Sequence, residues 1–226
     1  MEVTTRIANV VSILIVSLAL VFVLRSWLAD DEGTAAAFPE FDRVSPEFLK
    51  AAGSGHWIGP VDARVILVLY SDYWCSFCRE FDRQLRVVRN RYPEHLAVVV
   101  KPFVTLDTSA STKFFLAAEC AAEQGVFEAY HTWSMAMLQT NGRTDWTAVA
   151  DSVDVPNRAE FDQCVLTARL GNRIQGYYDE GVGLGVRAVP TSFINGYAYE
   201  GSMELSALDS AVARAMGRNA GLPQAR

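Results

Sequence analysis

Two short apolar runs, separated by one amphipathic segment, constrain the fold of this chain more than any other feature of its sequence. Residues 65–70 and 96–100 are almost entirely Val, Leu, Ile and Ala. Runs of this length and composition are typical of strands that are buried on both faces of a sheet. Between the two runs, large apolar residues recur at helical spacing: Phe81, Leu85, Val88 and Tyr92. Strand, helix and strand in this order predict a βαβ unit whose two strands are parallel.

A long helical region follows the second strand. The pattern from residue 107 to about residue 185 is helical in several segments, whereas a crossover between parallel strands needs only about a dozen residues. Because the region is much longer than a crossover, it predicts a helical subdomain (residues 107–185) inserted into the α/β core. Beyond it, residues 190–194 and 197–200 are expected to be strands joined by a tight Asn-Gly turn, and an amphipathic helix closes the pattern. The predicted order is β-α-β, helical insertion, β-β-α.

An uncharged apolar stretch, residues 7–24, lies near the N-terminus between Arg6 and Arg25. A membrane-spanning helix needs about 20 predominantly apolar residues, so residues 1–28 are expected to form an uncleaved transmembrane signal anchor. A cleaved signal peptide is the competing interpretation, but its apolar core is normally about 7–15 residues and its cleavage site follows closely. Arg6, in a short N-terminal tail, favours a cytoplasmic N-terminus with the globular part outside the cytoplasm, although Arg25 opposes this orientation.

The remaining boundaries follow from composition. Residues 29–59 mix acidic residues, Ala, Gly and Pro without a sustained period, and are expected to be a linker that contains one short helix. Residues 60–217 carry the ordered pattern and form the predicted domain, and residues 218–226 form a C-terminal tail. The formal net charge is −6 and no basic block is present, which argues against nucleic acid as a partner.

The pair Cys75 and Cys78 carries the chemistry that the sequence predicts. Cys75 falls where the first predicted strand ends and the helix begins. Unpaired backbone N–H groups and the helix dipole stabilise an anion at such a position, and the thiolate is the nucleophilic form of cysteine. We therefore expect the pKa of Cys75 to lie below the free value of about 8.5. A structural cysteine pair or a zinc half-site is the alternative interpretation of this spacing.

Residues 70–78 resemble the active-site stretch of DsbA-like proteins of the thioredoxin superfamily. Residues 189–191, Val-Pro-Thr, resemble the cis-proline loop of that superfamily, and Gly185-Val186 precedes them at the usual distance. The resemblance covers roughly residues 57–217. It implies an α/β thioredoxin-like fold with an inserted helical subdomain, here preceded by one N-terminal transmembrane helix.

The resemblance also implies a role for each matching residue. Cys75 would be the exposed, attacking cysteine, and Cys78 the buried cysteine that resolves or re-forms the bridge. Pro190 would be cis, with the Val189 backbone pairing with the substrate chain, and no cofactor is implied. The dipeptide Ser76-Phe77 departs from the family pattern, in which Pro often comes first and strong oxidants can carry His second. How oxidising the pair is therefore remains open at this point.

Two further cysteines, Cys120 and Cys164, each fall within a predicted helix of the insertion. An even number of cysteines in an extracytoplasmic domain favours a structural disulfide between them. Two buried free thiols are the alternative. A zinc site made of all four cysteines would consume the catalytic thiols, so no metal site is expected.

Three other residues have less specific interpretations. Trp74 is expected either to contact substrate beside Cys75 or to pack against the loop. His131 is expected to be a core or boundary histidine rather than a ligand. Lys101 closes the second predicted strand and is expected to mark its solvated end.

The expected function is disulfide transfer to unfolded or partly folded extracytoplasmic polypeptides. By family analogy, a quinone-linked membrane partner of the DsbB or vitamin K epoxide reductase-like type would re-oxidise the pair. The expected location is the cell membrane, with a single span and the catalytic domain outside the cytoplasm. Two alternatives are a disulfide reductase or isomerase of the same fold, and an anchored chaperone or binding module that needs neither active-site cysteine.

Overall fold

One mixed sheet forms the centre of the computed structural model, which describes residues 45–104, 109–137 and 145–218. Within these residues the strand order is β1-β3-β2-β4-β5. The strands are β1 (His56–Ile58), β2 (Val65–Ser71), β3 (Leu96–Pro102), β4 (Thr191–Ile194) and β5 (Tyr197–Glu200). Strands β2 and β3 are parallel, as the βαβ pattern predicts, and the other neighbouring strands are antiparallel.

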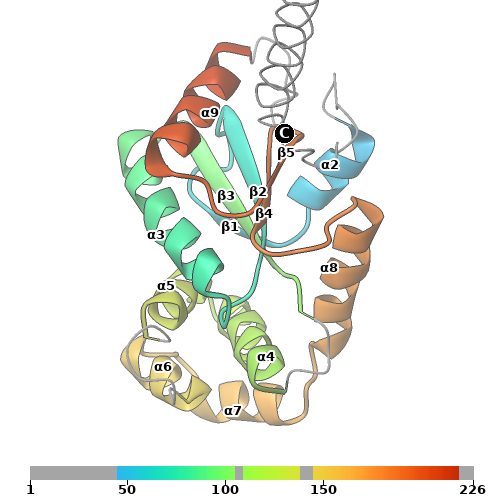
Figure 1. Ribbon diagram of the computed structural model, residues 1–226. Helices are drawn as coiled ribbons and strands as arrows, with labels where there is room; N and C mark the ends of the chain where they lie inside the picture. The colour runs from blue at the N-terminus through green and yellow to red at the C-terminus, as the bar shows by residue number, and fades with distance from the viewer. Residues whose placement is uncertain (1–44, 105–108, 138–144, 219–226) are drawn as a thin grey trace, which may run out of the picture. The chain divides into compact units, whose positions relative to one another are not determined.

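Helices cover both faces of the sheet (Figure 1). These helices are α2 (Pro46–Ala52), α3 (Ser76–Arg91), α8 (Gly171–Gly183) and α9 (Leu205–Arg218). Side chains of a strand alternate between the two faces. Leu67 and Leu69 of β2 therefore pack in the cluster with α3 and α9, whereas Val68 and Tyr70 pack in the cluster with α2. Burial on both faces explains why β2 is a continuous apolar run rather than an alternating one.

Helices α4 to α8 lie between β3 and β4 in the chain. The first four are α4 (Ser109–Glu123), α5 (Phe127–Met137), α6 (Trp146–Ser152) and α7 (Arg158–Leu166). They share a third apolar cluster, separate from the two that cover the sheet, and gather at the bottom of Figure 1. Cys120 of α4 and Cys164 of α7 form a disulfide within this cluster.

The expected linker at residues 29–59 needs correction over its second half. Strand β1 pairs antiparallel with β3, and Phe48 of α2 is fully buried against the sheet. Both elements therefore belong to the folded domain. The short helix was expected, but a three-residue edge strand is too short to show a period in the sequence.

The chain divides into two compact units, Met1–Pro39 and Glu40–Arg226, and every described residue belongs to the second. The expected transmembrane segment at residues 7–24 and most of the expected C-terminal tail lie outside the described residues. Among the residues that are described, no helix has both the length and the apolar character needed to cross a membrane.

Lys101 does not lie at a solvated strand end, so this prediction was wrong. Its side chain is fully buried, and its Nζ forms an ion pair with Glu180 of α8. Nζ also donates to Ser54 Oγ at 2.8 Å, and the Tyr70 hydroxyl donates to Glu180 Oε1 at 2.6 Å. A lysine can be buried when its charge is paired and its N–H groups donate hydrogen bonds. This polar cluster joins α8 to β2 and β3.

Loss of the Cys120–Cys164 disulfide is expected to destabilise the domain. The bridge closes a loop between residues 44 apart, and disulfides typically contribute about 2–4 kcal/mol by restricting the unfolded chain. Cys120→Ala, Cys164→Ala and the double variant should each lower the free energy of unfolding in urea by that amount. Because either single substitution removes the whole bridge, their effects should not add. Additive losses, or none, would contradict a stabilising role for the bridge.

Candidate active site

Cys75 is the N-cap residue of α3. Strand β2 ends at Ser71, a turn follows in which the Cys75 amide donates to the Asp72 carbonyl at 3.2 Å, and α3 begins at Ser76. The Cys75 Sγ accepts a hydrogen bond from the Cys78 amide at 3.2 Å. A serine, threonine or aspartate oxygen usually makes this contact at an N-cap. Here a sulfur takes that place, so unpaired N–H groups of the helix point at it.

The two thiols of this pair differ in acidity. The pKa of Cys75 is lowered to about 6, first by its hydrogen bond with the Cys78 side chain and also by the amides of Cys78 and Phe77. Burial and the Asp72 carboxylate act in the opposite direction. Burial, and then the hydrogen bond with Cys75, raise the pKa of Cys78 well above its usual value. At neutral pH the accessible Cys75 is therefore a thiolate and the buried Cys78 a thiol.

The cis-proline loop lies beside the Cys75 sulfur. The Val189–Pro190 peptide bond is cis. The Cys75 Sγ lies 3.6 Å from the Val189 carbonyl oxygen, to which only the protonated thiol donates a hydrogen bond. Thr191 Oγ1 donates to the Ala188 carbonyl at 2.7 Å, across the same loop. The structure thus brings together residues more than a hundred positions apart in the chain, as the family resemblance implies.

Two exposed aromatic side chains flank Cys75. Trp74 is 39% exposed and Phe77 is 68% exposed. Trp74 also packs edge-on against Phe114 of α4, with 6.2 Å between ring centroids. The Trp74 ring therefore packs on the helical insertion rather than on the loop and still reaches solvent, while its contact with substrate stays a prediction. No role was predicted for Phe77 from the sequence. Its signal was a large apolar residue outside the apolar stripe of α3, and such exposed residues often lie in binding surfaces.

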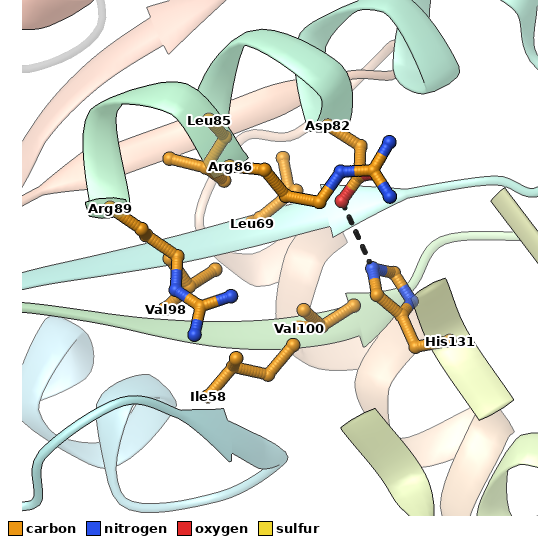
Figure 2. A pocket seen from close by; sticks show the side chains of 9 residues that line it. All are labelled: Ile58, Leu69, Asp82, Leu85, Arg86, Arg89, Val98, Val100 and His131. Atoms are coloured by element: carbon orange, nitrogen blue, oxygen red, sulfur yellow. Dashed lines mark hydrogen bonds and ion pairs between the residues drawn. The ribbon is translucent and has the colours of Figure 1, made fainter. Parts of the chain in front are cut away.

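A small cavity lies between α3, α5 and the sheet (Figure 2). His131 lies in its wall, with Nε2 3.3 Å from Asp82 Oδ1 and Nδ1 3.2 Å from the Tyr73 hydroxyl. His131 is buried, as expected for a core histidine. Neither Cys75 nor Cys78 lines this cavity. Cys75 is half-buried, whereas the neighbouring Trp74 and Phe77 are exposed.

No cluster suited to a metal ion was found among the His, Cys, Asp and Glu side chains of the described residues. Cys120 and Cys164 are bonded to each other, so they are not available as thiolate ligands.

The fold and this pair of cysteines define a thioredoxin-type protein. A family model described as thioredoxin matches residues 51–214, which is well over half of the chain. The chain therefore belongs to this thioredoxin family. The match includes the CxxC segment, the helical insertion and the cis-proline loop.

Solved structures of DsbA-like proteins share the fold. Oxidised BdbD from Bacillus subtilis matches with a TM-score of 0.65 and 14% identity, over 75% of this chain and 95% of that one. Alpha-DsbA1 from Wolbachia pipientis matches with a TM-score of 0.63 and 17% identity, over 72% and 91%. The catalytic domain of ScsC from Proteus mirabilis matches with a TM-score of 0.59 and 22% identity, over 74% and 91%. The chain thus shares the fold of these three proteins.

The curated relatives that this chain matches are larger proteins, and the match covers only a part of each. The Na(+)/H(+) antiporter NhaA 3 from Salinispora tropica is 28% identical over 164 residues, which is 70% of this chain and 24% of the antiporter. NhaA 1 from Mycolicibacterium vanbaalenii is 28% identical over 68% of this chain and 25% of its own length. The chain therefore spans about a quarter of the length of the curated relatives that it matches.

The thiolate of the reduced protein should titrate with a midpoint near pH 6, because the pKa of Cys75 is lowered to about 6. The absorbance at 240 nm of reduced minus oxidised protein measures this titration. A cysteine pKa that is lower in the folded than in the unfolded state stabilises the fold most above the unfolded value of about 8.5. The stability of the reduced form relative to the oxidised form should therefore fall as the pH is lowered from 8.5 to 6. A midpoint near 8.5 would contradict the lowered pKa of Cys75.

Proposed function

We propose that this protein is a thiol–disulfide oxidoreductase that donates disulfides to extracytoplasmic polypeptides through Cys75 and Cys78. One observation carries the proposal: the Cys75 sulfur caps α3 beside a buried Cys78, and its pKa is lowered to about 6. A thiol whose thiolate is stabilised is a better leaving group, and it also stabilises the reduced form of the pair. Both effects favour transfer of the disulfide to a substrate.

The reaction exchanges one disulfide for another. A substrate thiolate attacks Cys75 Sγ of the oxidised pair, the Cys75–Cys78 bond breaks, and Cys78 leaves and takes up a proton. A second substrate thiolate then attacks the substrate sulfur of the mixed disulfide, and Cys75 leaves as a thiolate. The substrate loses two electrons and its two thiols become a disulfide, while the enzyme pair gains the two electrons.

The surroundings of Cys75 support a polypeptide substrate. The Val189 peptide group lies beside the sulfur, where the backbone of an extended chain attached to Cys75 can pair with it. The exposed rings of Trp74 and Phe77 offer apolar surface on the same side. Aromatic residues are enriched in protein interfaces because they bury a large area with little loss of side-chain entropy. Unfolded chains expose the apolar residues that such a surface binds.

The place of action that we propose follows from the N-terminal sequence. Residues 7–24 would anchor the protein in the cell membrane, with the catalytic domain on the extracytoplasmic side. A quinone-linked membrane partner of the DsbB or vitamin K epoxide reductase-like type would return the pair to the disulfide. An anchor confines both proteins to one plane and raises their effective concentration for each other.

The reduction potential of the Cys75–Cys78 pair tests the direction of transfer. The full chain, equilibrated with glutathione buffers, should give a value nearer to DsbA, about −120 mV, than to thioredoxin, about −270 mV. A value at the thioredoxin end would instead indicate a reductase or isomerase.

Single substitutions test the roles of the two cysteines. Cys75→Ser should abolish oxidation of a reduced dithiol peptide, because the attacked sulfur is lost. Cys78→Ser should instead accumulate a mixed disulfide when it is mixed with a disulfide-linked dimer of a single-cysteine peptide. The Cys75 thiolate attacks one peptide sulfur, the other peptide leaves as a thiolate, and no second active-site thiol releases the bound peptide. The product is visible by mass spectrometry under non-reducing conditions. If a variant that lacks both thiols retained full function in the cell, an anchored chaperone module would replace the oxidoreductase.

A further inference from the structure

We propose that Asp72, fixed by Ser111 of the helical insertion, is a positioning residue that tunes the redox pair by holding a negative charge beside Cys75. The inference rests on the proposed thiol–disulfide function and names one residue that sets how oxidising the Cys75–Cys78 pair is. Neither the CxxC motif nor the cis-proline loop contains these two residues.

Asp72 shapes the turn that delivers Cys75 to the start of α3. Its Oδ1 accepts a hydrogen bond from the Trp74 amide at 2.9 Å, and its carbonyl accepts one from the Cys75 amide at 3.2 Å. Aspartate and asparagine side chains favour turns in this way, by bonding to the backbone two residues further on. The carboxylate is therefore held at the base of the loop that carries the nucleophile.

Ser111 fixes the same carboxylate from another part of the molecule. Its hydroxyl donates to Asp72 Oδ1 at 2.5 Å, and the side chain is buried in the first turns of α4. Since α4 begins the inserted subdomain, the contact joins the insertion to the loop that precedes α3. Two donors on one oxygen restrict where the carboxylate can go.

The Asp72 carboxylate shifts the pKa of Cys75 in the direction opposite to that of the groups that donate hydrogen bonds to its sulfur. From α3, the Cys78 thiol and amide lower the pKa of Cys75, whereas Asp72 raises it. Arg79, also on α3, donates to the Tyr73 carbonyl at 2.9 Å. The contact from α4 is the uncharged Ser111 hydroxyl, and the contact from the cis-proline loop is the Val189 carbonyl. Among these described groups, Asp72 is the carboxylate that destabilises the Cys75 thiolate.

Asp72→Asn separates charge from geometry. Asparagine retains a side-chain oxygen that can accept from Trp74 and Ser111, and it is equally suited to the turn, but it carries no charge. The thiolate of Cys75 should become more stable, and its pKa should fall by about half a unit, a threefold rise in the ionisation constant. The reduction potential should become more oxidising by the equivalent of about 15 mV. Asp72→Ser, which also keeps a turn-forming oxygen without charge, provides a second variant should Asp72→Asn fail to fold.

Ser111→Ala, alone and combined with Asp72→Asn in a double-mutant cycle, tests whether the hydrogen bond from Ser111 positions the Asp72 carboxylate. Without the hydroxyl the carboxylate is free to turn toward water, where its charge is screened. Ser111→Ala alone should therefore lower the pKa of Cys75 by less than Asp72→Asn does. In the Asp72→Asn background it should have no further effect, because no charge remains to be positioned.

The titration at 240 nm, made on the full chain, is the primary measurement. An unchanged or raised pKa of Cys75 in both uncharged variants would overturn the proposal. A shift from Ser111→Ala that persists in the Asp72→Asn background would overturn the role of Ser111 in fixing the charge. The titration does not require turnover, so loss of disulfide exchange with the expected pKa shifts would count against the proposed function and not against this inference.

Discussion

The hydrogen bond from the Cys78 amide to the Cys75 sulfur is the interaction on which the site depends. It forms because α3 begins immediately after Cys75, one turn beyond the end of β2. The packing of Leu85 and Val88 against the sheet holds the helix in that direction. A helix tilted or started one residue later would aim its free N–H groups away from the sulfur. The core of the domain therefore supports the acidity of one surface thiol.

The central fold could be predicted because its information is local. The apolar runs of β2 and β3 and the period of α3 each specify one element, and their order leaves few topologies. The pairing of Cys75 with Cys78 also follows from local position. The approach of Pro190 to Cys75 does not, because no pattern in the sequence relates positions so far apart. The family resemblance supplied that part of the site.

The parts that sequence reasoning missed depend on partners far along the chain. Lys101 can be buried because Glu180 pairs its charge and accepts a hydrogen bond from it, and nothing around Lys101 in the sequence indicates this partner. Ser111 is one of two serines at the start of α4, and only its contact with Asp72 distinguishes it. Exposure of Phe77 was visible in principle, since the residue interrupts the polar side of α3. Tertiary contacts, rather than propensity, decided each of these cases.

The two outer strands of the sheet have a consequence for a protein proposed to meet unfolded chains. Strand edges carry unpaired N–H and C=O groups onto which another extended polypeptide can add. Strand β1 spans only His56–Ile58 and β5 only Tyr197–Glu200. An incoming chain can form only a few backbone hydrogen bonds with strands this short, so its binding to them is weak. An unfolded substrate therefore binds poorly to the edges of the sheet and remains available to react with Cys75.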